Sequence, residues 1–294
     1  MKTKHLILGI IFLFAISSSF ASNGNESRES LSKQLIKEWL DGNDAKIVDL
    51  TQQMYSLNSY DLSVLKWAHN ITSEIGQNGA LMIKNSSEII PILIVQYAKN
   101  TRKDVQLLNY EFYKSNPLYK KQIDLYLKGS KLNTKTETLF VQSVSNHAKN
   151  VHLSFSEIQS IDAQSEIKNH LYLTGLTYQY SKTQIDNTSI IRRNYEKRYY
   201  LEQLDDVFRK EINENEVNRI NETYLPSLLK LYKHYIQTEE HEKGLKIADR
   251  IAKIGSKSGQ KQAILEILKP NQLAYDQFEF LTADLKYRDL EKSI

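Results

Sequence analysis

The sequence GALMIKNSSEIIPILIVQYAKNTRKDVQLLNYEFYKSNPLY, residues 79–119, predicts the centre of the fold. Ala80–Ile83 and Val105–Leu108 are short apolar runs of the kind that form buried strands. Between them Ser86 or Ser87 is expected to cap a helix, whose apolar residues recur at helical spacing: Ile90, Leu93, Ile94 and Tyr97. Strand, helix and strand within about 30 residues predict a right-handed βαβ unit.

The segments around this unit predict a mostly helical α+β fold with a small central sheet. Residues 22–78 carry three apolar stripes at helical spacing, which predict three N-terminal helices after a disordered lead-in. Residues 79–183 are expected to form an α/β core, with further strands at Thr138–Gln142, Val151–Phe155 and Leu171–Tyr180. Apolar and polar residues alternate in the second of these, as in a half-buried strand.

Residues 184–294 are expected to form a helical, repeat-like half. Asp186 is placed to cap a long helix that runs through Phe208. A second long helix is expected over Glu214–Thr238, and Pro226 should kink or split it because proline lacks the backbone donor. Shorter helices follow, over Glu239–Ile254 and Gln260–Leu268.

The helix pair expected over Leu225–Ile254 partly resembles a tetratricopeptide hairpin. Leu231 lies on the apolar stripe of the first helix, and the small residue Gly244 opens the second helix, where it permits close approach. Tyr232 and Ile251 stand where that repeat has small residues. An ordinary helical hairpin is therefore the alternative interpretation.

The first 21 residues are typical of a secretory signal peptide. Lys2 and Lys4 form a basic start, Leu6–Ile16 is an apolar run too short to span a bilayer, and Ser19-Phe20-Ala21 is a small-x-small cleavage site. We therefore expect cleavage after residue 21 and a periplasmic or secreted protein.

Composition excludes several classes of function. The formal net charge of the chain is only +4, which does not favour nucleic-acid binding. The chain has no cysteine, so disulfides and thiolate metal sites are excluded. After the signal peptide no apolar run is long enough to predict a membrane span. No catalytic, cofactor-binding or metal-binding motif is recognisable, so we assign no cofactor, no metal ligand and no catalytic residue.

The densest basic cluster is a candidate site for binding a protein or peptide partner. It reads Arg192-Arg193-Asn194-Tyr195-Glu196-Lys197-Arg198 and lies on the first helix of the C-terminal half. Tyrosine and arginine dominate interface hot spots. The expected partner-binding residues are Arg192, Tyr195, Arg198 and Tyr199, and both tyrosines are expected to be exposed. Export, the repeat-like helices and the lack of a catalytic motif favour a non-catalytic envelope scaffold or adaptor, which would use these residues to bind its partner. The alternative is a solvated helix face on which Glu202 pairs with Arg198.

A second candidate site lies where the predicted strands of the βαβ unit end. Ligands of open α/β sheets bind beside the carboxyl ends of the strands. The polar residues there are Asn85, Glu88, Asn109 and Glu111. They would serve the alternative function, an envelope enzyme acting on glycan or peptide.

Part of the chain resembles a known family. The stretches that carry the resemblance are Gly79–Tyr119, Leu171–Ser181, Asp186-Asn187 and Asn194–Tyr199. They resemble the soluble region that follows the membrane spans in a bacterial family of protein-O-mannosyltransferase-like membrane proteins of uncharacterised function. The individual matches are Ala80–Ile83, Pro91, Gln96 and Asp104-Val105. An acidic loop of that family is replaced here by Asn85–Ile90, and its membrane part has no counterpart. The resemblance therefore implies a fold fragment and a periplasmic setting, but no activity.

Overall fold

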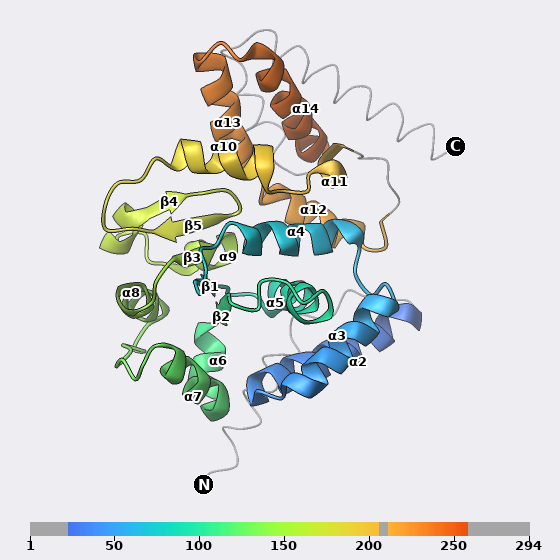
Figure 1. The fold of residues 1–294 in the computed structure, drawn as a ribbon, viewed down its shortest axis with the longest axis vertical. Helices are drawn as coiled ribbons and strands as arrows, with labels where there is room; N and C mark the ends of the chain where they lie inside the picture. Colours follow the sequence, from blue (N-terminus) through green and yellow to red (C-terminus); the bar gives the residue numbers. More distant parts are fainter. Residues whose placement is uncertain (1–22, 206–210, 258–294) are drawn as a thin grey trace.

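The computed structural model describes residues 23–205 and 211–257 (Figure 1). The predicted signal peptide over residues 1–21, the expected helix end at Phe208 and the helix expected over Gln260–Leu268 lie outside these ranges. The described part is mostly helical with a small sheet, which confirms the predicted α+β class. None of the described helices combines the length and apolarity needed to cross a bilayer.

The centre of the molecule is a five-stranded mixed sheet in the order β2-β1-β3-β5-β4. Its strands are β1 (Ala80–Met82), β2 (Gln106–Leu108), β3 (Val151–Ser154), β4 (Leu171–Leu173) and β5 (Thr177–Tyr180). Strand β1 runs parallel to both β2 and β3, whereas β5 runs antiparallel to β3 and to β4. The amino ends of β1, β2 and β3 therefore share one edge of the sheet, and their carboxyl ends share the other.

The predicted strand–helix–strand unit is present. Strand β1 is followed by α5 (Ser86–Leu93), which continues as a π-helical turn, η1 (Ile94–Ala98), before β2. The prediction that Ser86 or Ser87 caps this helix is wrong. Both serines are already helical, and Asn85 occupies the cap position. Pro91 lies inside α5, beyond its first turn.

The prediction of a strand over Thr138–Gln142 is wrong. This segment belongs to helix α8 (Glu137–His147), whose first turn is capped by the hydroxyl of Thr136. Phe140, Val141 and Val144 form its buried face. A five-residue apolar run does not distinguish a strand from one face of a helix.

Two strand predictions are corrected in detail. Strand β3 is buried on both faces, not half-buried as predicted. His152 and Ser154 are therefore inside the protein. The stretch Leu171–Tyr180 is not one strand but the hairpin β4–β5, whose turn contains Gly175 with φ +157°.

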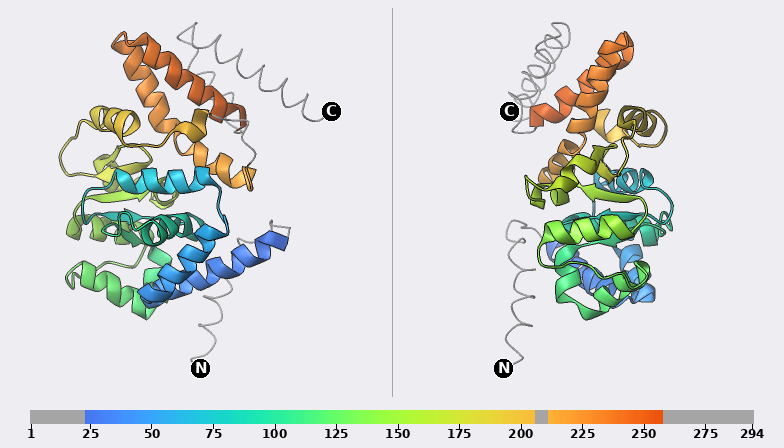
Figure 2. Two further views of the ribbon diagram at one scale, coloured as in Figure 1. Left: turned by 45° about the vertical axis from the view of Figure 1, so that its right-hand side comes forward. Right: turned by 90° about the vertical axis from the view of Figure 1, so that its left-hand side faces the viewer.

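Three helices precede the sheet, as predicted: α2 (Asn23–Asp41), α3 (Asp44–Ser56) and α4 (Leu62–Ser73). Because α2 begins at Asn23, the segment expected to be a disordered lead-in is helical. Figure 2 shows α2 and α3 at one end of the molecule, whereas α4 lies beside the sheet. The helices after β2 and β3 are α6 (Tyr110–Ser115), α7 (Pro117–Tyr126), α9 (Phe155–Ser160) and the 3₁₀ turn η2 (Glu166–His170).

The C-terminal half is helical, but each of the two long helices predicted there is divided into two shorter ones within the described residues. They are α10 (Asn187–Lys197), α11 (Glu202–Asp205), α12 (Glu214–Glu222), α13 (Leu225–Gln237) and α14 (His241–Lys257). Asp186 caps α10 as expected. Pro226 lies in the first turn of α13, so it marks a split rather than a kink. Helices α13 and α14 pack together as the predicted hairpin.

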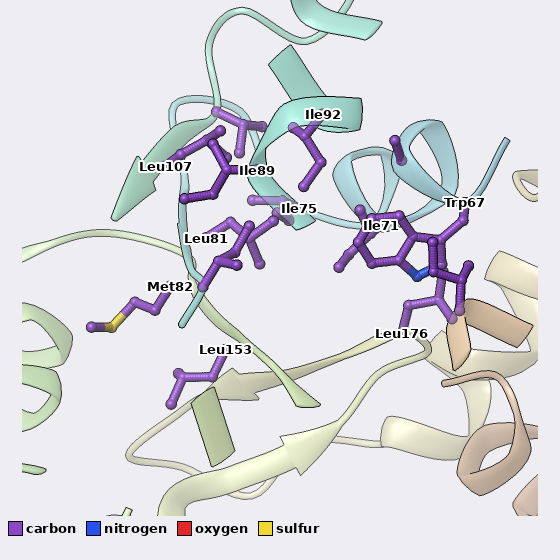
Figure 3. Packing of buried hydrophobic residues seen from close by; sticks show 14 of the residues in the cluster. Trp67, Ile71, Ile75, Leu81, Met82, Ile89, Ile92, Leu107, Leu153 and Leu176 are labelled. Atoms are coloured by element: carbon purple, nitrogen blue, oxygen red, sulfur yellow. The ribbon is translucent and has the colours of Figure 1, made fainter. Parts of the chain in front are cut away.

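The buried apolar side chains form one continuous cluster that extends from α2 to α14. Figure 3 shows its central part, in which Trp67 and Ile71 of α4 are drawn with Leu81 of β1 and Leu176 of the β4–β5 turn. These four side chains are each at most 2 % exposed. Helix α4 is thus fixed against the sheet, and its C-terminal end is held beside the β4–β5 turn.

Candidate functional site

The structure brings the predicted strand-end site together only in part. Asn85 Nδ2 donates to Glu88 Oε1 at 3.4 Å, so these two residues meet. Asn109 is buried, and its amide donates to two carbonyl oxygens of the loop after β1, both at 2.8 Å. It therefore holds that loop. Glu111 is exposed on the first turn of α6. None of these four residues lines the cavity described below.

Two buried acids lie at this end of the sheet. Glu88 is already engaged, because it accepts from Ser156 Oγ at 2.9 Å and from Arg219 Nη1 at 3.3 Å. Glu157 was not predicted. It is fully buried, and neither carboxyl oxygen has a hydrogen-bond partner in the described structure. Burial, with a smaller effect from the charge of Glu137, raises the pKa of Glu157 to about 8, so it is protonated at neutral pH.

The tyrosines of the predicted partner-binding cluster are not exposed. Tyr195 is 6 % and Tyr199 9 % exposed. The Tyr195 hydroxyl is hydrogen-bonded to Ser227 Oγ at 2.6 Å, and the two tyrosine rings are 5.0 Å apart. This face of α10 is covered because the helix packs against α13 and β4. The prediction of two exposed tyrosines is therefore wrong, since an amphipathic helix directs its aromatic side to the core.

The arginines of that cluster have separate environments. Arg192 forms ion pairs with Glu196 at 3.0 Å and with Glu240 at 2.9 Å, so its charge is balanced. Arg198 does not pair with Glu202, which instead binds a lysine of α4 at 3.1 Å. Of the four predicted residues, only Arg198 lines a cavity.

This cavity has a volume of about 530 Å³ and lies at the amino ends of the parallel strands, opposite to the predicted strand-end site. Its wall is built from the C-terminal end of α4, the loop before β2, the start of β3, strand β5 and helix α10. Three arginines line it: Arg102, Arg193 and Arg198. We call it the arginine cavity.

Arg102 is held rigidly in the wall. Its guanidinium donates to both carboxylate oxygens of Asp104 at 3.0 Å and to the carbonyl oxygens of Thr72 at 2.6 Å and Ile75 at 2.8 Å. The side chain of Gln96 in η1 donates to the Arg102 carbonyl at 2.9 Å and so fixes the loop. The charge of Arg102 is therefore balanced by Asp104, and its donors are occupied.

Arg193 and Arg198 are supplied by α10. The buried amide of Asn194 donates to the Thr174 carbonyl at 2.8 Å, which fixes α10 against the β4–β5 turn. Arg193 is exposed, and its side chain has no hydrogen bond or ion pair with any described residue. Arg198 is also exposed. It makes two long hydrogen bonds of 3.4 Å, to the Ser73 carbonyl and to Asn194 Oδ1, and pairs with no carboxylate of the described chain.

The other titratable groups of the wall do not cancel these two charges. Burial raises the pKa of Glu74 to about 8, so it is neutral at pH 7. Burial lowers the pKa of His152 to about 3, so it is neutral as well. Its Nδ1 atom lies 2.7 Å from Thr177 Oγ1. With Asp104 matched by Arg102, the described wall carries a net charge of about +2 at neutral pH, from Arg193 and Arg198.

The chemistry of the arginine cavity is that of anion recognition. A guanidinium presents a planar fork of donors that fits a carboxylate or a phosphate. Two such groups without a carboxylate partner favour a ligand with two negative charges. The histidine–threonine pair offers no accessible nucleophile, because Thr177 is fully buried. No group of three or more His, Asp or Glu side chains in the described ranges could hold a metal ion.

The sequence contained only part of the signal for this site. Arg193 and Arg198 belong to the basic cluster that was singled out, but Glu74, Arg102 and His152 lie in segments without a motif. They meet at one edge of the sheet because of the strand order, which the sequence did not predict.

Comparisons of the chain with models of known protein families, with curated proteins and with solved structures found no match.

Proposed function

We propose that this protein is an exported, non-catalytic envelope protein, a scaffold or adaptor that binds a partner protein or peptide through acidic side chains held in the arginine cavity. The observation that carries the proposal is the pair Arg193 and Arg198, which line the cavity without a described carboxylate partner. Export rests on the signal peptide, and the family resemblance suggests the same periplasmic setting.

An acidic peptide segment suits the cavity in size and polarity. A volume of about 530 Å³ is in the range of sites that take a small ligand or a few side chains. The amides of Asn150 and Gln179 also line the wall, and amides can both donate to and accept from peptide groups. Two adjacent Asp or Glu side chains would match the guanidinium groups of Arg193 and Arg198, neither of which pairs with a carboxylate of the described residues.

The enzyme alternative has weaker support. Glu157 is a protonated acid near Glu88, which is the kind of pair that glycan hydrolysis uses. However, Glu157 is fully buried, and Glu88 is occupied by Ser156 and Arg219. A substrate would have to displace these contacts before it reached either acid.

The proposal is tested by binding of a fluorescently labelled peptide rich in Asp and Glu, followed by anisotropy at physiological salt. The variant is Arg193→Gln with Arg198→Gln. The matched control is Lys197→Gln with Lys233→Gln, which removes the same charge from exposed positions outside the cavity. We expect the cavity variant to weaken binding at least about tenfold, because hydrogen bonds to charged groups are worth about 1.5–3 kcal/mol each.

Three outcomes would contradict the proposal. The wild type fails to bind the acidic peptide, or it binds a Lys-rich peptide equally well, or the control variant loses as much affinity as the cavity variant. The last result would mean that the overall charge of the protein attracts the peptide. Inorganic phosphate is included as a competitor, and binding of phosphate without binding of the peptide would be a case of the first outcome.

A further inference from the structure

Glu74 is an acidic residue in the wall of the arginine cavity whose charge can change the net charge of that wall. It caps the C-terminal end of α4 and lines the cavity wall. Its carboxyl accepts from the Leu176 backbone N–H at 3.1 Å and from Thr174 Oγ1 at 3.3 Å. The Tyr199 hydroxyl, which accepts from the same Leu176 N–H at 3.3 Å, is a further hydrogen-bond partner of the carboxyl. The acid is thus held in one position by the β4–β5 turn and by the residues after α10.

The β4–β5 turn packs closely against this carboxyl. A Cβ atom at Gly175 would lie 2.0 Å from Tyr199 Oη and 2.6 Å from Glu74 Oε2. Glycine alone therefore permits the approach, and its φ of +157° also favours glycine. This close packing limits the access of water to the carboxyl, and Glu74 as a whole is 7 % exposed.

No basic side chain within the described ranges forms an ion pair with Glu74. Arg102 pairs with Asp104 and donates to backbone carbonyl oxygens. Arg198 makes two long hydrogen bonds, to the Ser73 carbonyl and to Asn194 Oδ1. The charge of Glu74 is therefore not balanced locally. It determines whether the described wall of the cavity carries about two net positive charges or about one.

We propose that acidic ligands bind the arginine cavity more tightly while Glu74 holds its proton, so that binding is linked to this proton and weakens when Glu74 ionises. This inference rests on the proposed function and adds its regulation. A negative ligand and an ionised Glu74 would share one small cavity wall, and like charges at close range disfavour each other.

The direction of the effect follows from the pKa of Glu74, which burial raises to about 8. Below that pH Glu74 is neutral and the cavity attracts an anion fully. As the pH rises through that value, Glu74 becomes negative and affinity falls. A bound anion raises the pKa of Glu74 further, so binding near that pH takes up protons.

The other groups that face Glu74 and the cavity keep their charge in this range. Burial raises the pKa of each tyrosine around the carboxyl, so they stay neutral: Tyr195, Tyr199 and Tyr224. Burial lowers the pKa of His152 to about 3, and that of His69, one turn earlier on α4, also below its ordinary value. Hydrogen bonds from Arg102 lower the pKa of Asp104, so it stays ionised. The remaining charged groups are the three arginines, which keep their charge.

The test measures the affinity of an N-acetylated, lysine-free acidic peptide from about pH 6.5 to about pH 9.5 at constant ionic strength. The carboxylates of such a peptide are ionised throughout this range. We expect about a tenfold loss of affinity for the wild type, which corresponds to a shift of one pKa unit on binding. Glu74→Gln should bind as the wild type does at the low end and show no loss at the high end.

A second variant, Tyr199→Phe, keeps the test decisive if Glu74→Gln fails to fold. Hydrogen bonding by Tyr199 lowers the pKa of Glu74, so Tyr199→Phe should move the midpoint of the affinity loss to higher pH. Glu111→Gln, at an exposed position, should leave the profile unchanged. A wild-type affinity that does not change with pH, or a loss that persists in Glu74→Gln, would overturn the proton linkage. Absence of binding at every pH would instead overturn the proposed function.

Discussion

Replacing Glu157 by Gln should make the protein more stable at neutral pH but not at acid pH. In the folded protein this carboxyl is fully buried without a hydrogen-bond partner in the described structure, and its pKa is raised to about 8 from an ordinary value near 4.5. Between these two pH values the folded state keeps a proton that the unfolded chain has released. The wild type therefore loses stability as the pH rises through this window.

The size of the effect follows from the linkage relation. One proton retained on folding changes the free energy of unfolding by up to about 1.4 kcal/mol per pH unit. From about pH 5 to about pH 7.5 Glu157 should therefore cost the wild type about 3 kcal/mol. Glutamine keeps the shape but does not ionise. Its buried amide lacks a partner much as the neutral carboxyl does, so the two proteins should be of similar stability near pH 5.

The assay is urea unfolding of the wild type and of Glu157→Gln at several pH values across this window. Glu74 contributes a slope of the same sign, because its pKa is also raised to about 8, but it is present in both proteins and cancels in the difference. Glu111→Gln, at an exposed position, is the control. A stability difference that stays constant with pH would refute the reasoning, because Glu157 would then be ionised in the folded state.

Three further predictions concern the helical hairpin, the β4–β5 turn and processing. Leu231→Ala should cost about 2–5 kcal/mol in chemical unfolding, since it leaves a cavity, whereas the exposed Lys233→Ala should cost less than about 0.5. Gly175→Ala should lower stability by more than about 2 kcal/mol, because its Cβ would overlap Tyr199; an unchanged melting temperature would contradict this. N-terminal sequencing of the exported protein should begin at Ser22, and recovery of the initiator methionine would rule out cleavage.

The βαβ centre was predictable because several local signals agree. The apolar runs at Ala80–Ile83 and Val105–Leu108 are bounded by polar residues, and the helical stripe between them has no competing pattern. The cap at Asp186 was predictable because it depends on the chemistry of one residue. At Pro226 the sequence predicted an interruption, either a kink or a split, and the structure shows the split.

Other elements depend on tertiary contacts that local sequence does not contain. Thr138–Gln142 is apolar enough for a strand, but it packs as one face of α8. His152 looked like the exposed side of a half-buried strand, but it is only 2 % exposed, and its Nδ1 atom lies 2.7 Å from Thr177 Oγ1 of β5. Neither result could be read from periodicity alone.

The candidate site was predictable only as a cluster of basic residues. The sequence singled out Arg198 together with Tyr195 and Tyr199, but it did not show that the tyrosines face the core and the arginine faces a cavity. The neutral state of Glu74 could not be predicted either, because its raised pKa results from burial against the β4–β5 turn.

The central claim is that Arg193 and Arg198 select an acidic partner. Reversing both charges, with Arg193→Glu and Arg198→Glu, tests it most directly when the variant and the wild type are each titrated with an acidic and a Lys-rich peptide of equal length. The account predicts that the wild type prefers the acidic peptide and that the variant prefers the Lys-rich one. A folded variant that keeps the preference of the wild type would contradict it.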